Sequence, residues 1–136
     1  MKPFLPLLLV AAMSAAAQAD VTVGVILSTT GPGASLGIPE RNTVALLPKE
    51  IAGQAVKYVV LDDGSDSTAA AKNARKLVSE NQVDLLIGST TVPTSAAVAQ
   101  IAKESQTAQI ALAPYSPPGG EQQWIFTIAQ TNALMA

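Results

Sequence analysis

The chain has 136 residues, enough for one modest domain, and its eight Lys and Arg against ten Asp and Glu residues give a formal net charge of −2. It contains neither cysteine nor histidine, which excludes disulfides, a zinc site and a histidine-based catalytic triad. No basic patch is present, so nucleic acid is not an expected partner.

Residues 1–19 have the pattern of a cleavable secretory signal peptide. Lys2 supplies a positive start, residues 4–16 are apolar and rich in alanine, and Ala17-Gln18-Ala19 is a small-x-small cleavage site. The apolar run is short for a membrane span, so an uncleaved anchor is the less favoured interpretation. We therefore expect an exported protein whose mature chain begins at Asp20.

The first mature segment predicts a strand, a loop and a helix. Val21–Leu27 is nearly continuous in apolar and β-branched residues, as expected of a parallel strand buried on both faces. Ser28–Gly37 contains three glycines and one proline and is interpreted as a loop. A helix should follow with Pro39 in its first turn, be broken or bent by Pro48, and be closed by Gly53.

The next segment brings three acidic residues to one strand end. Val56–Leu61 is the second predicted strand and is followed by Asp62 and Asp63, while Asp66 or Ser67 caps the next helix. The acidic residues could form a metal or acid–base cluster. A strand-end turn followed by a helix cap is the favoured interpretation, because no partner acid or base is identifiable.

The third predicted strand is followed by a loop rich in hydroxyl residues and by an alanine-rich helix. The remaining predicted elements, in chain order, are the strand Leu85–Ile87, the helix Thr94–Ser105, the strand Gln109–Leu112, the loop Ala113–Gly120, the strand Trp124–Ile128 and the first turns of a helix at Thr131–Ala136. Because the chain stops inside an apparent helix, we expect a domain truncated after its fifth strand.

The alternation of strands and helices predicts an α/β fold with a doubly wound parallel sheet in the order 2-1-3-4-5. In such sheets ligands bind beyond the carboxyl ends of the strands, where the strand order reverses. The loops Ser28–Gly37 and Gly88–Ser95 meet there, and Ala113–Gly120 forms the neighbouring wall. We predict a binding cleft, although Ser and Thr also serve as turn residues and caps, and Tyr115 could line the pocket or cover the core edge.

A dinucleotide-binding fold is a competing interpretation. Gly31-Pro32-Gly33 with Gly37 follows a strand, and acidic residues end the next one, which superficially matches the Rossmann fingerprint. Three residues separate the strand from the first glycine, however, and Pro32 intrudes where a tight turn is required. Export would also remove the protein from cytoplasmic cofactor pools, so no cofactor is expected.

The motifs together resemble the amino-terminal lobe of a type I periplasmic binding protein of the leucine/isoleucine/valine-binding kind, the solute-binding component of an ABC importer. The residues that carry the resemblance are Gly24 to Pro32, Ala34 to Gly37, Asp62, Asp63, Asp66, Ala74 to Leu77, Val83, Asp84, Ile87 to Thr91, Pro93, Ser95, Trp124 to Phe126 and Gln130 to Asn132. The resemblance implies a periplasmic protein, not an enzyme, that passes a small solute to a membrane permease.

The resemblance also implies the ligand contacts. Ser89, Thr90 and Thr91 would hold a ligand carboxylate through hydroxyls and amides, and Ala113 and Tyr115 would contact its amino or neighbouring groups. The candidate site is completed by residues of the opposite loop, namely Ser28, Leu36 and Gly37. Ligands of either amino-acid or aromatic-carboxylate type fit the motifs.

Two departures from the family pattern affect these expectations. Ala113-Pro114-Tyr115-Ser116 stands where the family has small residues and a hydroxyl, which leaves the amino-acid chemistry of the pocket open. Family members are also much longer, so residues 20–136 correspond to one lobe and offer half a cleft. The alternative to an importer component is a ligand-sensing module with the same lobe. An oxidoreductase domain is a less favoured alternative.

Overall fold

The computed structural model describes residues 20–118 and 123–130. The predicted signal peptide, the residues Gly119 and Gly120 of the fourth loop, and the predicted helix at Thr131–Ala136 lie outside the described residues. None of the helices in the described ranges combines the length and the apolar character needed to cross a membrane.

Strands and helices alternate along the chain as predicted. The elements are β1 (Val21–Leu27), α1 (Ala34–Val44), β2 (Glu50–Ile51), β3 (Gln54–Asp62), α2 (Ser67–Ser79), β4 (Leu85–Ile87), α3 (Val92–Ser105), β5 (Ala108–Ala111) and β6 (Ile125–Thr127). The sheet order is β2-β3-β1-β4-β5-β6, and every pair except β2–β3 is parallel. With β2 set aside, the order is the predicted 2-1-3-4-5, so the fold class is confirmed.

Two local predictions were wrong. The first helix begins at Ala34 rather than after Gly37, because the amides of Ala34 and Gly37 already bond to carbonyls of the preceding turn, and Pro39 therefore lies inside the helix. Gly53 does not close a helix but forms, with Ala52, a tight turn with positive φ at both residues. This turn creates the short strand β2, which has no counterpart in the predicted elements.

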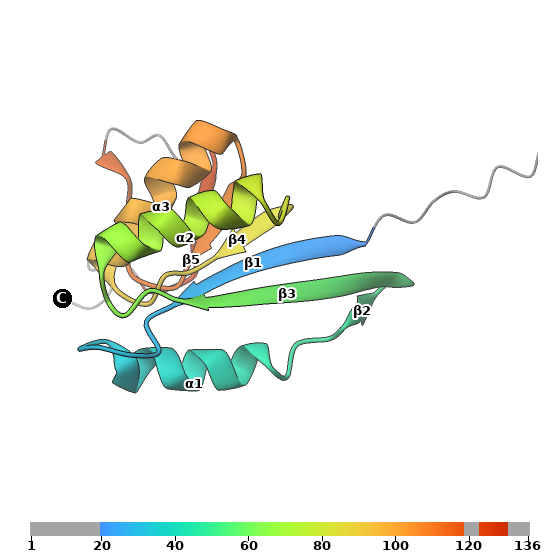
Figure 1. Ribbon diagram of the computed structural model, residues 1–136, viewed down its shortest axis with the longest axis horizontal. Helices are drawn as coiled ribbons and strands as arrows, with labels where there is room; N and C mark the ends of the chain where they lie inside the picture. Colours follow the sequence, from blue (N-terminus) through green and yellow to red (C-terminus); the bar gives the residue numbers. More distant parts are fainter. Residues whose placement is uncertain (1–19, 119–122, 131–136) are drawn as a thin grey trace, which may run out of the picture.

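The two faces of the sheet are covered unequally (Figure 1). Helices α2 and α3 pack together on one face, over a core that includes the fully buried Leu77, Leu86 and Val98. Burying one such side chain contributes about 2 kcal/mol of transfer free energy. Of the helices in the described residues, α1 alone lies on the other face, over a smaller cluster that includes Val25 and Leu27.

Candidate ligand-binding site

The carboxyl ends of three adjacent strands form one edge of the sheet. Leu27 at the end of β1 pairs with Asp62 of β3, while β4 pairs along the other side of β1. The strand order reverses at this point because β1 lies between β3 and β4. The segments after β1 and β4 meet here, and the amide of Ser28 donates to Thr90 Oγ1 over 2.9 Å.

Two glycines allow the backbone of this edge to pack closely. Gly88 follows β4 with a φ of +121°, and a Cβ at this position would lie 2.0 Å from the carbonyl oxygen of Ile26. A Cβ on Gly37, in α1, would lie 2.1 Å from the carbonyl oxygen of Ser28. Any side chain at either position would displace backbone, so the shape of this edge depends on both glycines.

A buried carboxylate connects the two hydroxyl-rich loops. Asp63 is only 2% exposed and directly follows β3. Its Oδ1 accepts a hydrogen bond from Ser28 Oγ over 2.7 Å, and its Oδ2 accepts one from Ser89 Oγ over 2.5 Å. The amide of Ser65 also donates to Oδ1 over 2.9 Å. Asp63 thus joins the ends of β1, β3 and β4.

A second carboxylate reaches the same cluster from α1. Glu40 Oε2 accepts a hydrogen bond from Thr90 Oγ1 over 2.6 Å. Burial raises the pKa of Glu40, the hydrogen bond from Thr90 opposes that rise, and the negative charge of Asp63 adds to it. Two carboxylates therefore accept hydrogen bonds from hydroxyl groups of the candidate site.

Thr91 has a different role from its two neighbours because it is the N-cap of α3. Its hydroxyl accepts from the amide of Thr94, and the amide of Thr91 donates to Thr94 Oγ1 over 3.2 Å, which completes a capping box. Thr91 is half-buried, whereas Ser28, Ser89 and Thr90 are buried. Thr91 Oγ1 also lies 2.8 Å from Thr94 Oγ1.

The other candidate residues are spread around this cluster. Gly37 is buried against Ser28, but Leu36 is 59% exposed on α1. Ala113 is buried after β5, and Tyr115 packs against the core beneath α2 and α3. The amide of Tyr115 donates to the carbonyl of Ala113 over 2.7 Å, and the Tyr115 carbonyl accepts from Thr127 Oγ1 over 2.5 Å.

Asp62, the last residue of β3, and Asp66 form a turn and a helix cap, as favoured from the sequence. Asp62 Oδ1 accepts from the amides of Thr29, Thr30 and Gly64, and Oδ2 accepts from the Thr30 hydroxyl. Burial alone would raise the pKa of Asp62, but the hydrogen bonds from the Thr30 hydroxyl and the three amides outweigh it and lower the pKa to about 2. Asp66 is the N-cap of α2. Within the described ranges, no group of three or more acidic side chains could hold a metal ion.

The sequence of the chain matches a family of known proteins. A model of the periplasmic binding proteins matches residues 20–136. The chain belongs to the periplasmic binding protein family. The resemblance noted in the sequence is therefore confirmed, and with it a family of solute-binding proteins rather than enzymes. A comparison with curated protein sequences gave no match.

Solved structures of this family share the fold of the lobe. An extracellular ligand-binding receptor from Rhodopseudomonas palustris HaA2 is 44% identical, with a TM-score of 0.80 over 83% of this chain and 32% of its own. A leucine-binding protein from Thermotoga maritima is 26% identical, with a TM-score of 0.72 over 84% and 34%. A solute-binding protein of an ABC transporter from Rhodopseudomonas palustris BisB5, in complex with 3,4-dihydroxybenzoic acid, is 22% identical, with a TM-score of 0.73 over 82% and 32%, and shares the fold alone. The chain spans about a third of the length of these structures.

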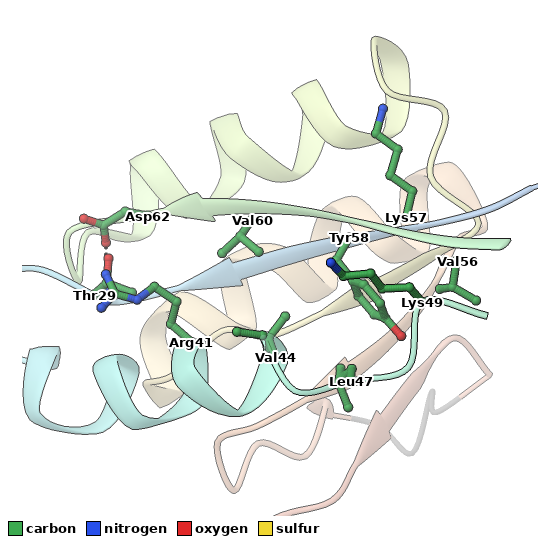
Figure 2. Close-up of a pocket in the computed structure, with 11 residues that line it drawn as sticks. Thr29, Arg41, Val44, Leu47, Lys49, Val56, Lys57, Tyr58, Val60 and Asp62 are labelled. Carbon is green, nitrogen blue, oxygen red and sulfur yellow. Dashed lines mark hydrogen bonds between the residues drawn. The ribbon is translucent and has the colours of Figure 1, made fainter. Parts of the chain in front are cut away.

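A large cavity of this periplasmic binding protein lobe does not coincide with the candidate site. It has a volume of about 750 Å³ and lies between α1 and the sheet, lined by Val44, Tyr58 and Val60 and bordered by Arg41 and Lys57 (Figure 2). Thr29 and Asp62 lie at the end of the cavity nearest the strand ends, and the side chain of Arg41 extends toward Thr29 (Figure 2). The cavity marks incomplete cover of one sheet face, whereas the site is defined by the converging loops.

Sequence reasoning missed two residues that this lobe uses at the edge. Asp63 was interpreted as part of a turn, and Glu40 was not among the candidate site residues. Adjacent residues of a strand point to opposite faces, so only one of Asp62 and Asp63 could be exposed on a given face. This alternation was the available signal that Asp63 could be buried. No local pattern indicates Glu40, whose hydrogen bond to Thr90 spans 50 residues of sequence.

Proposed function

We propose that the chain is the amino-terminal lobe of the substrate-binding component of an ABC importer, and that it binds amino acids of the branched-chain type or related small aromatic carboxylates. The observation that carries this proposal is the convergence of the hydroxyl-rich loops after β1 and β4 where the strand order reverses, in a chain of the periplasmic binding protein family.

In this proposal the loop after β4 supplies the donors for the ligand carboxylate. Ser89, Thr90 and Thr91 lie next to the first turn of α3, where the positive end of the helix dipole favours a negative charge. Ala113 and Tyr115, after β5, contact the rest of the ligand. The opposite wall consists of Ser28, Leu36 and Gly37.

The location and partner are part of the same proposal. Residues 1–19 act as a signal peptide that is removed after Ala19, and the mature protein acts in the periplasm. It delivers its solute to the membrane permease of the importer. The family assignment supports this location, and the 26% identical relative is described as a leucine-binding protein.

A single lobe provides one wall of a two-walled cleft. The related structures are about three times as long as the part that this chain matches. We therefore expect this chain alone to bind a ligand weakly, because the second wall would supply much of the buried contact area.

A ligand-sensing role is the second candidate. The 44% identical structure from Rhodopseudomonas palustris is described as an extracellular ligand-binding receptor, and this description does not mention a transporter. Deleting the gene in the source organism separates the two roles. Loss of solute uptake supports the importer component, whereas normal uptake with loss of a solute-induced response supports the sensor.

Ligand binding is tested by NMR titration of the ¹⁵N-labelled chain, a method that detects weak complexes. We expect leucine, isoleucine or 3,4-dihydroxybenzoate at millimolar concentration to shift amide signals of residues 28–37, 89–91 and 113–115. A Thr91→Val variant should respond about tenfold more weakly, because one hydroxyl donor to a charged group is lost. Shifts caused by a nicotinamide dinucleotide and by none of these carboxylates would contradict the proposal.

A further inference from the structure

We propose that Asp63 is a positioning residue of the site. Its buried carboxylate accepts hydrogen bonds from the hydroxyls of Ser28 and Ser89, and so fixes the loops after β1 and β4 relative to each other. The part of this inference that concerns ligand binding rests on the proposed function. The part that concerns the positions of the loops rests on the hydrogen bonds alone. It assigns these serines to holding the loops, and leaves ligand recognition to other donors of the same site.

The hydrogen bonds around Asp63 form a closed ring. Ser28 and Ser89 donate to its two oxygens, Ser89 Oγ accepts from the amide of Thr90 over 2.6 Å, and Thr90 Oγ1 accepts from the amide of Ser28 over 2.9 Å. Every member of the ring is buried. In such a ring each loop is bonded both to Asp63 and to the other loop. Moving one loop would therefore break its bonds to both partners.

The direction of the protons decides what these residues can do. A serine or threonine hydroxyl has one proton to donate. The hydroxyls of Ser28 and Ser89 donate their hydrogen bonds to Asp63, and the hydroxyl of Thr90 donates its hydrogen bond to Glu40. None of the three hydroxyls can then donate to a ligand carboxylate while the ring is intact. The amides of Thr90 and Thr91 also donate inside the loop, to Ser89 Oγ and Thr94 Oγ1. The Thr91 hydroxyl lies 2.8 Å from Thr94 Oγ1, so a ligand carboxylate would have to draw this donor from the capping box.

Asp63 is suited to this role because its charge is held by fixed donors. Its oxygens accept from two hydroxyls and from the amide of Ser65, and it is 2% exposed. Buried polar groups are stable only when their hydrogen bonds are made, so the loops cannot turn away without leaving the carboxylate unpaired. An asparagine at this position would present an N–H₂ group to one of the two serines and reverse that bond.

The first test needs no ligand and no variant. The hydroxyl protons of Ser28 and Ser89 should be visible in NMR spectra and exchange with water at least tenfold more slowly than that of the exposed Ser79, which donates to the carbonyl of Arg75. Exchange of the two serine protons as fast as that of Ser79 would overturn the positioning role, whatever the chain binds.

The second test compares two aspartates. Asp63→Asn should shift the amide signals of both loops and weaken binding of leucine or 3,4-dihydroxybenzoate by about tenfold, the effect of losing one hydrogen bond to a charged group. Asp84→Asn is the matched control, because exposed Asp84 lies at the amino end of β4 and accepts from the Thr22 amide, away from both loops. Equal effects of the two variants on the loop signals would overturn the proposal.

A Ser28→Ala variant keeps the test decisive if Asp63→Asn fails to fold. Removal of the Ser28 hydroxyl should shift the signals of Ser89 and Thr90 on the other loop, through Asp63. A change confined to the loop after β1 would overturn the positioning role. If neither probe binds the unmodified chain but the serine protons are protected, the ligand assignment fails and the positioning of the loops stands.

Discussion

The two faces of the sheet differ in how completely helices cover them. On the face under α2 and α3, Leu77 and Leu86 are fully buried. On the face under α1, Val60 is 39% exposed and Ile51 54%, and a cavity of about 750 Å³ remains beside the helix (Figure 2). One face therefore has the packing of a finished core, while the other has apolar surface in contact with solvent.

The helices themselves explain the difference. Helix α2 carries small and large apolar residues at helical spacing, so that Ala70, Ala74 and Leu77 are all buried. Helix α1 has Gly37 as its one buried residue and presents it to the loop after β1. From this difference we infer that α2 and α3 stabilise the sheet, whereas α1 mainly positions the loop after β1.

The sharpest test of this comparison uses two neighbouring leucines of β4. Leu86 faces the core under α2 and α3, and Leu85 faces the cluster under α1. We expect Leu86→Ala to lower the free energy of unfolding by about 3 kcal/mol, because it leaves a cavity in packed surroundings. Leu85→Ala should cost about 1 kcal/mol, since its side chain is only partly buried.

Urea unfolding followed by circular dichroism measures both values in one protein. Each variant is the control for the other, because strand, residue type and size of the truncation are the same. Equal losses for the two leucines would mean that the face under α1 is packed as well as the opposite one, and the comparison would be wrong.

Much of the fold was predictable from the sequence because buried strands and amphipathic helices have distinct periods. The two failures were at the poorly covered edge. Strand β2 has two residues, both exposed, and therefore carries no apolar signal. Gly37 suggests a loop by composition, yet it lies in α1 because only a glycine can pack against the Ser28 carbonyl there.

The position of the candidate site was also predictable, whereas the roles of its hydroxyls were not. The carboxyl ends of parallel strands at a reversal point locate a crevice from topology alone. Which group receives the proton of a serine depends on tertiary contacts, and Asp63 is separated by 35 residues from Ser28 and by 26 from Ser89. A turn residue and a buried acceptor have the same appearance in the sequence.

The second prediction concerns an exposed carboxylate on the α1 side. Asp62→Asn removes the charge that accepts hydrogen bonds from the Thr30 hydroxyl and the amides of Thr29, Thr30 and Gly64. We expect a loss of about 1 kcal/mol at pH 7, a value reduced because solvent screens an exposed group. The measurement is urea unfolding of both proteins as a function of pH.

The sign of the pH dependence follows from the lowered pKa of Asp62. Its folded value of about 2 lies below the ordinary 3.8, so its stabilisation is complete above 3.8 and is lost as the pH falls towards 2. The difference between the two proteins should shrink over that interval. A difference that is constant from pH 7 to pH 2 would mean that the charge of Asp62 does not hold the loop.

The smallest expected effect has the opposite sign and lies on α1. The pKa of Glu40 is raised above its ordinary 4.5, so its ionised form disfavours the folded state, and this penalty appears as the pH rises through the folded value. Glu40→Gln keeps an oxygen for the Thr90 hydroxyl and removes the charge. We expect it to stabilise the protein by about 0.5 kcal/mol at pH 7, allowing for screening of a half-buried group, and to have no effect below pH 4.

Thermal unfolding at pH 7 and at pH 4 measures this difference, and Glu104→Gln is a suitable control because that exposed carboxylate lies only 3.8 Å from Arg75 across α2 and α3. If Glu40→Gln is instead less stable at pH 7, the hydrogen bond from Thr90 to a charged acceptor outweighs burial and the repulsion by Asp63. Helix α1 would then contribute to stability through its carboxylate as well as to the position of the loop, and the contrast between the two faces would be smaller than their packing indicates.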